Sequence, residues 1–115
     1  MSIIKSEKKG DVIVVRFDEG IQKFDALITE DGKKEINAFF DKPNTKLALS
    51  LDGIRYIDST GFGVFLSVMK TANNNYGFFK ICDIAPELME LFRLLQLHNV
   101  FDLYDDLDGC LKNFN

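Results

Sequence analysis

Short runs of apolar and β-branched residues recur along the chain, and each run predicts a β-strand. The run Val12 to Phe17 is rich in β-branched residues, and the preceding Lys8 to Asp11 has the glycine and aspartate of a hairpin turn. The run Lys46 to Leu51 is almost continuously apolar, as expected of a central strand that is covered on both faces. The predicted strands cover about Ile3 to Glu7, Val12 to Phe17, Lys46 to Leu51, Phe78 to Cys82 and Phe101 to Tyr104.

Longer segments between these runs carry apolar residues at helical spacing. The clearest follows Gly61, where Phe62, Phe65, Met69 and Ala72 recur at intervals of three and four residues. The other predicted helices run from Asp25 or Thr29 to Phe40, from Glu87 to Leu97 behind Pro86, and weakly from Leu107 to Phe114. Because strands alternate with helices, we expect an α/β sandwich with a partly parallel sheet.

The helix predicted from Glu87 to Leu97 is apolar on more than one side. Its expected inward face consists of Leu88, Leu91, Phe92 and Leu95. Further apolar residues lie outside that stripe, namely Met89, Leu94 and Leu97. Packing in the core explains most of this surplus, and a surface that meets a partner is the alternative for the remainder.

Composition and charge narrow the class of protein. With 115 residues and 13.1 kDa, the chain suits a single domain over residues 1–115. Hydrophobic residues make up 46% and charged residues 28%, which is typical of a folded globular domain. The net charge of -4 and the isoelectric point near 4.9 argue against binding to nucleic acid or to an anionic membrane.

The cysteines and the single histidine do not form a metal-binding pattern. Cys82 and Cys110 belong to no CxxC motif, and with His98 alone a zinc site of cysteine and histidine cannot be assembled. We expect two free thiols in a reducing compartment, with a lone disulfide as the alternative. No metal or cofactor is predicted. The sequence also shows no signal peptide and no apolar run near the ~20 residues of a membrane span, so we expect a cytoplasmic protein.

One octapeptide, Tyr56 to Gly63, concentrates the candidate chemistry where a strand passes into a helix. Asp58, Ser59 and Thr60 can each cap the helix, whose N-terminal amides and dipole favour an oxygen or an anion. A hydroxyl there can carry a phosphate without breaking the helix. Gly61 and Gly63 follow, and a residue without a side chain lets a backbone come close, either that of the chain itself or that of a partner. The simpler interpretation is an ordinary N-cap with a tight entry turn.

The spacing of residues around this octapeptide excludes the sequence motifs of several enzyme classes. A dinucleotide fingerprint needs a third glycine where Leu66 stands, and no phosphate-binding P-loop sequence is present. Ser59 is preceded at the required position by Ile57 rather than glycine, so it does not form the serine elbow of a hydrolase. A catalytic triad would have to use His98, because it is the single histidine of the sequence. We therefore expect no enzyme activity; a small enzyme that uses Ser59 or Asp58 is the competing class.

The arrangement around this octapeptide resembles the STAS domain of bacterial anti-sigma factor antagonists. The likeness includes the apolar strand at Leu47 to Leu51, the segment Ile54 to Leu66, and the strand, loop and helix from Lys80 to Phe92. It spans about residues 10 to 110. The resemblance implies a single STAS-type domain with a mixed sheet of four to five strands and about four helices.

The same resemblance implies a phosphorylation switch. Ser59 matches the serine that the cognate anti-sigma factor, a serine kinase with a GHKL-type ATP fold, phosphorylates in this family. In the family, the unphosphorylated antagonist binds the kinase and thereby frees the sigma factor. The phosphorylated form dissociates from the kinase, and a PP2C-type phosphatase removes the phosphate. Such a protein is a phosphoprotein and regulator of transcription with no catalytic residue of its own. The alternative within the family is a regulator outside sigma control or a component of a lipid-transport complex.

The switch surface implied by the resemblance consists of Asp25, Asp58, Ser59, Thr60, Gly61 and Gly63. The loop Gly20 to Asp25 carries two more residues than the usual family pattern, and Ser50 stands where aspartate or asparagine is common. We expect the loop to lie beside Ser59 and to contribute to the choice of partner. Phe24 within it either fills the core, which is the favoured interpretation, or anchors a partner.

Overall fold

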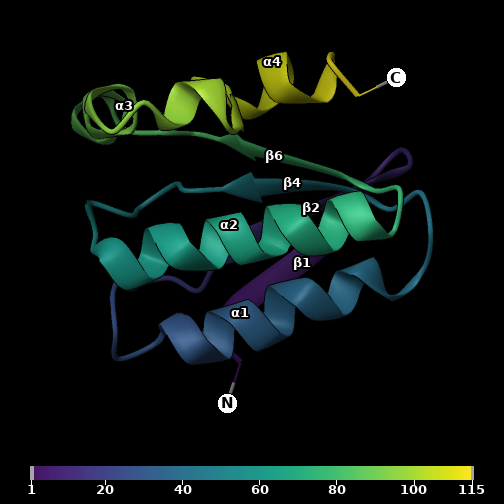
Figure 1. The fold of residues 1–115 in the computed structure, drawn as a ribbon, viewed down its shortest axis with the longest axis horizontal. Helices are drawn as coiled ribbons and strands as arrows, with labels where there is room; N and C mark the ends of the chain where they lie inside the picture. Colours follow the sequence, from purple (N-terminus) through teal and green to yellow (C-terminus); the bar gives the residue numbers. More distant parts are fainter. Residues whose placement is uncertain (1, 115) are drawn as a thin grey trace.

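The computed structural model describes residues 2–114 and shows an α/β domain built on a five-stranded sheet (Figure 1). The strand order in this sheet is β1-β2-β4-β6-β7, with β1 antiparallel to β2 and the other neighbours parallel. The helices and strands are β1 (Ile4–Lys9), β2 (Val12–Phe17), β3 (Lys23–Phe24), α1 (Thr29–Asn37), β4 (Lys46–Ser50), β5 (Tyr56–Ile57), α2 (Ser59–Asn74), β6 (Phe78–Cys82), α3 (Pro86–Leu94), β7 (Asp102–Leu103) and α4 (Leu107–Leu111). The predicted fold class is confirmed.

Alternate residues of the central strands face different helices, so the two faces of the sheet have separate environments. The face formed by Leu47, Leu49 and Ile81 belongs to a large core that also contains α1, α2 and α3. Ala48 and Cys82 point the other way and pack with α4 in a smaller cluster. Figure 1 shows α1 and α2 running side by side, with α3 and α4 beyond β6. All five strands of the predicted list are present.

Phenylalanine rings fill the large core and join its helices. The ring centroids of Phe24 and Phe65 lie 5.6 Å apart in a stacked pair, and those of Phe62 and Phe92 lie 5.2 Å apart edge to face. Phe101 packs edge to face on both Phe65 and Phe92. These contacts fix α2 against α3 and explain why the sequence uses phenylalanine so heavily.

A two-stranded parallel sheet between β3 and β5 was not predicted from the sequence. Lys23 pairs with Tyr56, and Phe24 pairs with Ile57. The strands are too short to show a pattern of alternation, because each has two residues. Their pairing nevertheless ties the loop before α1 to the segment before α2, and this positions the candidate site.

The helix α3 is shorter than predicted. It ends at Leu94, and Gln96 adopts a left-handed conformation before a 3-10 turn over Leu97–Asn99. The predicted inward face is therefore wrong at Leu95, which is exposed, and Met89 is buried in its place. The early end of the helix rotates the last leucines of the periodic pattern out of the core.

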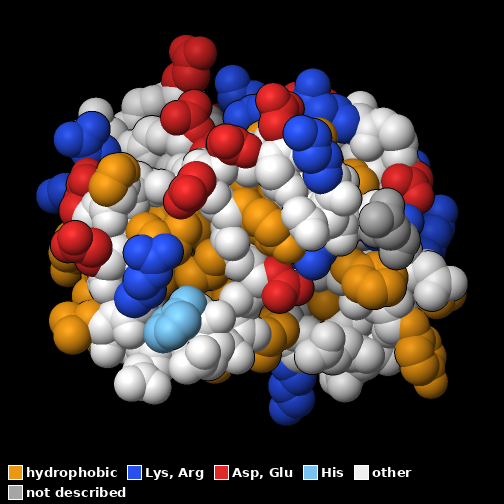
Figure 2. Space-filling model, turned by 90° about the horizontal axis from the view of Figure 1, so that it is seen from above, with side chains coloured by type: hydrophobic (Ala, Val, Ile, Leu, Met, Phe, Trp, Pro, Cys, Tyr) orange, Lys and Arg blue, Asp and Glu red, His pale blue; other side chains and the backbone are white. Residues whose placement is uncertain are grey.

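The surface over α3 and α4 is chemically mixed. Figure 2 shows acidic and basic side chains interspersed there, with small hydrophobic patches between them. Leu94, the last residue of α3, has 79% of its surface exposed. Across residues 2–114 no helix combines the length and the apolar character that a crossing of the bilayer demands.

Candidate functional site

The predicted capping motif forms the N-terminus of α2. Asp58 is the N-cap residue in an extended conformation, and its Oδ1 accepts a hydrogen bond from the amide of Gly61 at 3.1 Å. The Thr60 hydroxyl donates to the same oxygen at 2.5 Å. Asp58 thus accepts hydrogen bonds from two donors of the first helical turn. The helix begins at Ser59, three residues before Phe62, where the predicted apolar pattern starts.

The second carboxylate oxygen of Asp58 reaches across to the loop before α1. Oδ2 accepts a hydrogen bond from the amide of Ala26 at 3.1 Å, and the Thr29 hydroxyl donates to the Thr60 hydroxyl at 3.1 Å. The backbone amide of Asp58 also donates to the carbonyl of Phe24 at 3.3 Å. Asp58 and Thr60 therefore join α2 to the start of α1 on both sides of Ser59.

These donors keep Asp58 ionised. The hydrogen bond from the Thr60 hydroxyl, with those from the amides of Gly61 and Ala26, holds the pKa of Asp58 below its ordinary value of 3.8. Partial burial acts in the opposite direction and is outweighed. A fixed negative charge therefore lies next to Ser59 at neutral pH.

Ser59 and Thr60 differ in how their hydroxyl groups are used. Both side chains are exposed. The Thr60 hydroxyl is committed to Asp58 and Thr29, whereas the Ser59 hydroxyl makes no hydrogen bond to any of residues 2–114. Ser59 is therefore the free hydroxyl at the start of α2, where the helix dipole favours added negative charge.

The two glycines of the motif have different environments. A Cβ atom on Gly61 would lie 2.6 Å from Ile57 Cγ2 and 2.8 Å from the carbonyl oxygen of Phe24, so the close approach expected there is confirmed. Gly63 is exposed, and nothing lies within 4 Å of the position of its Cβ. The chain itself therefore packs no backbone against Gly63 within residues 2–114, and the approach of a partner's backbone to this outward-facing residue stays a prediction.

The loop before α1 lies beside the motif, as its position in the chain predicted. Phe24 is completely buried between Phe17 and Phe65, which confirms the core interpretation and removes it as a partner anchor. Asp25 builds the turn that follows, since its Oδ1 accepts a hydrogen bond from the amide of Leu27 at 3.1 Å. This turn presents Leu27 with 89% of its surface exposed.

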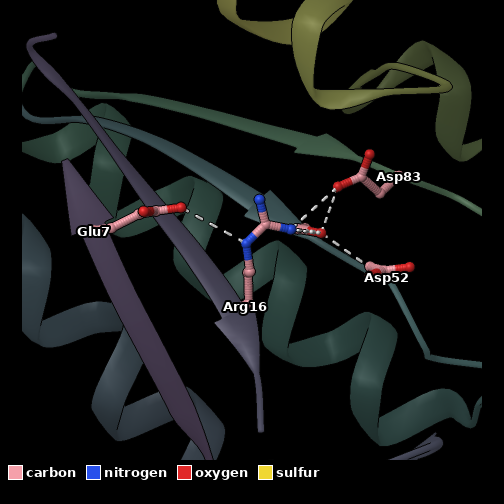
Figure 3. A network of polar contacts seen from close by, with 5 residues as sticks. Glu7, Arg16, Asp52 and Asp83 are labelled. Atoms are coloured by element: carbon pink, nitrogen blue, oxygen red, sulfur yellow. Dashed lines mark hydrogen bonds and ion pairs between the residues drawn. The ribbon is translucent and has the colours of Figure 1, made fainter. Parts of the chain in front are cut away.

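A second polar cluster lies at the carboxyl ends of β2, β4 and β6 (Figure 3). The buried Ser50 hydroxyl donates to Asp83 at 2.6 Å and accepts from the amide of Asp52 at 3.2 Å. Arg16 approaches Asp83 at 3.7 Å and Glu7 at 3.9 Å. Ser50 therefore replaces the usual longer polar residue as the centre of a network that ties three strands together.

Sequence reasoning missed Leu27 and this network. The signal for the network was available, because Ser50 interrupts an apolar strand and Asp83 follows the next parallel strand. Leu27 carried no signal, since its exposure depends on the turn made by Asp25 and on the bond between Ala26 and Asp58. No group of three or more residues suited to hold a metal ion occurs within residues 2–114.

Comparisons with known sequences agree on one protein family. The model of the STAS domain family matches residues 4–110. The anti-sigma F factor antagonist of Paenibacillus polymyxa is 32% identical over 60 residues, which is 52% of this chain and 51% of that protein. The matched segment thus spans about half the length of that relative.

Comparison with solved structures supports the fold. An anti-sigma factor antagonist fold from Thermotoga maritima superposes with a TM-score of 0.86 at 20% identity, covering 96% of this chain and 93% of that one. The Bacillus cell fate determinant SpoIIAA in its phosphorylated form superposes with a TM-score of 0.67 at 14% identity, covering 97% of this chain and 99% of that one.

Proposed function

The chain belongs to the STAS domain family, and on this premise we propose that it acts as an anti-sigma factor antagonist that is switched off by phosphorylation of Ser59. The observation that carries the proposal is the Ser59 hydroxyl, which is exposed at the first position of α2 and is free of hydrogen bonds within residues 2–114. A phosphorylated form exists for SpoIIAA, which shares the fold. The unphosphorylated chain would bind the anti-sigma factor and thereby free the sigma factor.

The proposed switch acts on binding more than on folding. A phosphate on Ser59 adds about 1.5 to 2 negative charges at pH 7, and the N-terminus of α2 tolerates such charge. The ionised Asp58 beside it increases the negative charge of the surface. A partner packed closely on this surface would have to desolvate the phosphate or repel it, so it would dissociate.

The surface proposed to meet the partner surrounds Ser59 on α2 and on the neighbouring loop. Gly63 and Leu66 follow Ser59 on the exposed side of α2, because they lie about one and two turns further along the helix. Leu27 stands next to the residue bonded to Asp58 and is the most exposed large apolar side chain of residues 2–114. We assign to Leu27 the anchor role that the buried Phe24 cannot fill.

The proposed partners follow from the family. They are an anti-sigma factor with a GHKL-type serine kinase fold and a PP2C-type phosphatase that removes the phosphate. In this pathway the chain is a cytoplasmic substrate and binding module rather than an enzyme. In this proposal the turn Asp58 to Thr60 holds α1 and α2 together and exposes Ser59 to the partner.

Phosphate mapping after incubation with ATP and the serine kinase encoded in a neighbouring reading frame tests the switch. We expect the label on Ser59, its loss in Ser59→Ala and its retention in the matched control Thr60→Val. Ser59→Asp should weaken kinase binding while leaving the melting temperature nearly unchanged. Label mainly on Thr60, or full labelling of Ser59→Ala, would contradict the proposal.

The anchor role of Leu27 needs a separate binding measurement with the same kinase. Leu27→Ala should reduce affinity by about tenfold, as expected of a leucine in a well-packed interface. The matched control is Leu94→Ala, which removes the same kind of side chain, 79% exposed, from α3. Equal effects of the two substitutions would reject a specific role for Leu27.

A further inference from the structure

The two cysteines of the chain meet on the face of the sheet that α4 covers. Cys82 ends β6, and Cys110 lies in α4, 28 positions further along the chain. Both are completely buried, and both belong to the small cluster that holds α4 against the sheet. In the described structure both are free thiols. The fold thus brings together the two sulfur atoms of the whole sequence that can form a disulfide.

The surroundings of the pair act on the pKa of the Cys110 thiol in both directions. The hydrogen bond with Cys82 lowers the pKa of the Cys110 thiol, while burial acts in the opposite direction. Lys80 lies on the same face as Cys82 and adds a positive charge that also lowers the pKa of Cys110. The Lys80 ammonium is held there by Asp102 at 3.0 Å and by the ring of Phe114, whose centroid is 5.3 Å away. The thiolate is the form that attacks an oxidant.

We propose that Cys82 and Cys110 form a redox modification site, at which a peroxide closes a disulfide between β6 and α4. The site is separate from Ser59 and goes beyond the proposed switch. The helix α4 has five residues and is fastened through side-chain packing, so transient opening of this short element gives the oxidant access.

The reaction balances with hydrogen peroxide as the oxidant. The sulfur of Cys110 attacks one peroxide oxygen, the O–O bond breaks, and the other oxygen leaves as water, which gives a sulfenic acid. The sulfur of Cys82 then attacks that of Cys110, the S–O bond breaks, and a second water leaves with the remaining thiol proton. Two thiols are oxidised to one disulfide, and one peroxide is reduced to two waters.

Treatment of the native protein with hydrogen peroxide, followed by denaturation, alkylation and mass spectrometry, tests the site. We expect a monomer that has lost the mass of two hydrogen atoms, resists alkylation, and yields a peptide linking Cys82 to Cys110. Dithiothreitol should restore two alkylated thiols. Cys82→Ala and Cys110→Ala are matched controls that retain one thiol each and should give no such crosslink.

A second readout reports what the crosslink does to the fold. Oxidation should raise the melting temperature by roughly 10 °C, because the bridge restricts the unfolded chain. It should also slow amide exchange in α4 at least tenfold, while the amides of Ser59 and Thr60 exchange as before. Two alkylatable thiols after treatment, oxidation to sulfinic acid without a crosslink, disulfides between molecules, or a crosslink formed only in denaturant would each overturn the proposal.

Discussion

The two faces of the central sheet are built differently, although the same strands supply both. The face toward α1, α2 and α3 is a continuous aromatic core, and side-chain hydrogen bonds of Asp58 and Thr60 hold α1 and the loop before it against the start of α2. The opposite face has α4 and a small cluster around the cysteines, next to the polar network of Arg16, Ser50 and Asp83. The first face is thus held by a large aromatic core, and the second by a smaller apolar cluster beside a polar network.

This difference explains where the two proposed events take place. A switch that acts on binding needs a rigid presentation of Ser59, and the aromatic core together with Asp58 provides it. A thiol pair that must be reached by an oxidant needs a cover that opens, and our proposal assigns this part to the five-residue α4. The contrast can be tested by removing one contact from each face.

The largest effect is expected from Phe24→Ala, since Phe24 lies fully buried between Phe17 and Phe65. Loss of this side chain should reduce the free energy of unfolding by about 3 to 5 kcal/mol. The matched control is Phe114→Ala, which removes the same side chain from the smaller cluster on the α4 face, where Phe114 keeps 8% of its surface exposed. Chemical denaturation measures both. Equal losses would show that the two faces are equally well packed.

Substitutions of the two glycines of α2 should change stability by smaller amounts and in opposite directions. Gly61→Ala should destabilise the domain by about 1 to 3 kcal/mol, because the new methyl group meets Ile57 and the Phe24 carbonyl. Gly63→Ala should stabilise it by up to about 1 kcal/mol, because the methyl group points into open space and alanine favours the helix. Denaturant unfolding distinguishes the two. Destabilisation by Gly63→Ala would contradict the open environment of that residue.

The smallest effect concerns the pH dependence contributed by Asp58. Its pKa is lowered in the folded state, so its stabilising contribution is present above the unfolded value near 3.8 and is lost as the pH falls through the folded value. Asp58→Asn keeps the cap but cannot titrate. The difference in unfolding free energy between the wild type and this variant should therefore shrink below about pH 4. If this difference in unfolding free energy stayed constant from pH 7 to pH 3, the stabilising role of the ionised Asp58 carboxylate would be contradicted.

Local sequence patterns predicted most of the elements. The strands Val12–Phe17 and Phe78–Cys82 have the predicted bounds. The end of α3 was placed too late, because the leucine pattern continues through Leu95 while the backbone leaves the helix at Gln96. The pairing of β3 with β5 was missed, since two residues are too few to show a period.

The candidate site was predicted in part. The sequence named Asp58, Ser59 and Thr60 as residues at the start of a helix, and α2 begins there. It could not say which hydroxyl is free, because that depends on Thr29, which lies 31 positions from Thr60. It also could not say that Gly61 packs against Ile57 and Phe24 while Gly63 faces open space, because these contacts come from segments outside the helix.

The sequence by itself therefore determined the order of strands and helices and the capping turn, because hydrophobic period and capping chemistry act over a few neighbouring residues. Only the tertiary structure decided that Phe24 is buried and Leu27 exposed, and that Cys82 meets Cys110. These outcomes depend on how distant segments pack, and packing joins residues that no local pattern relates.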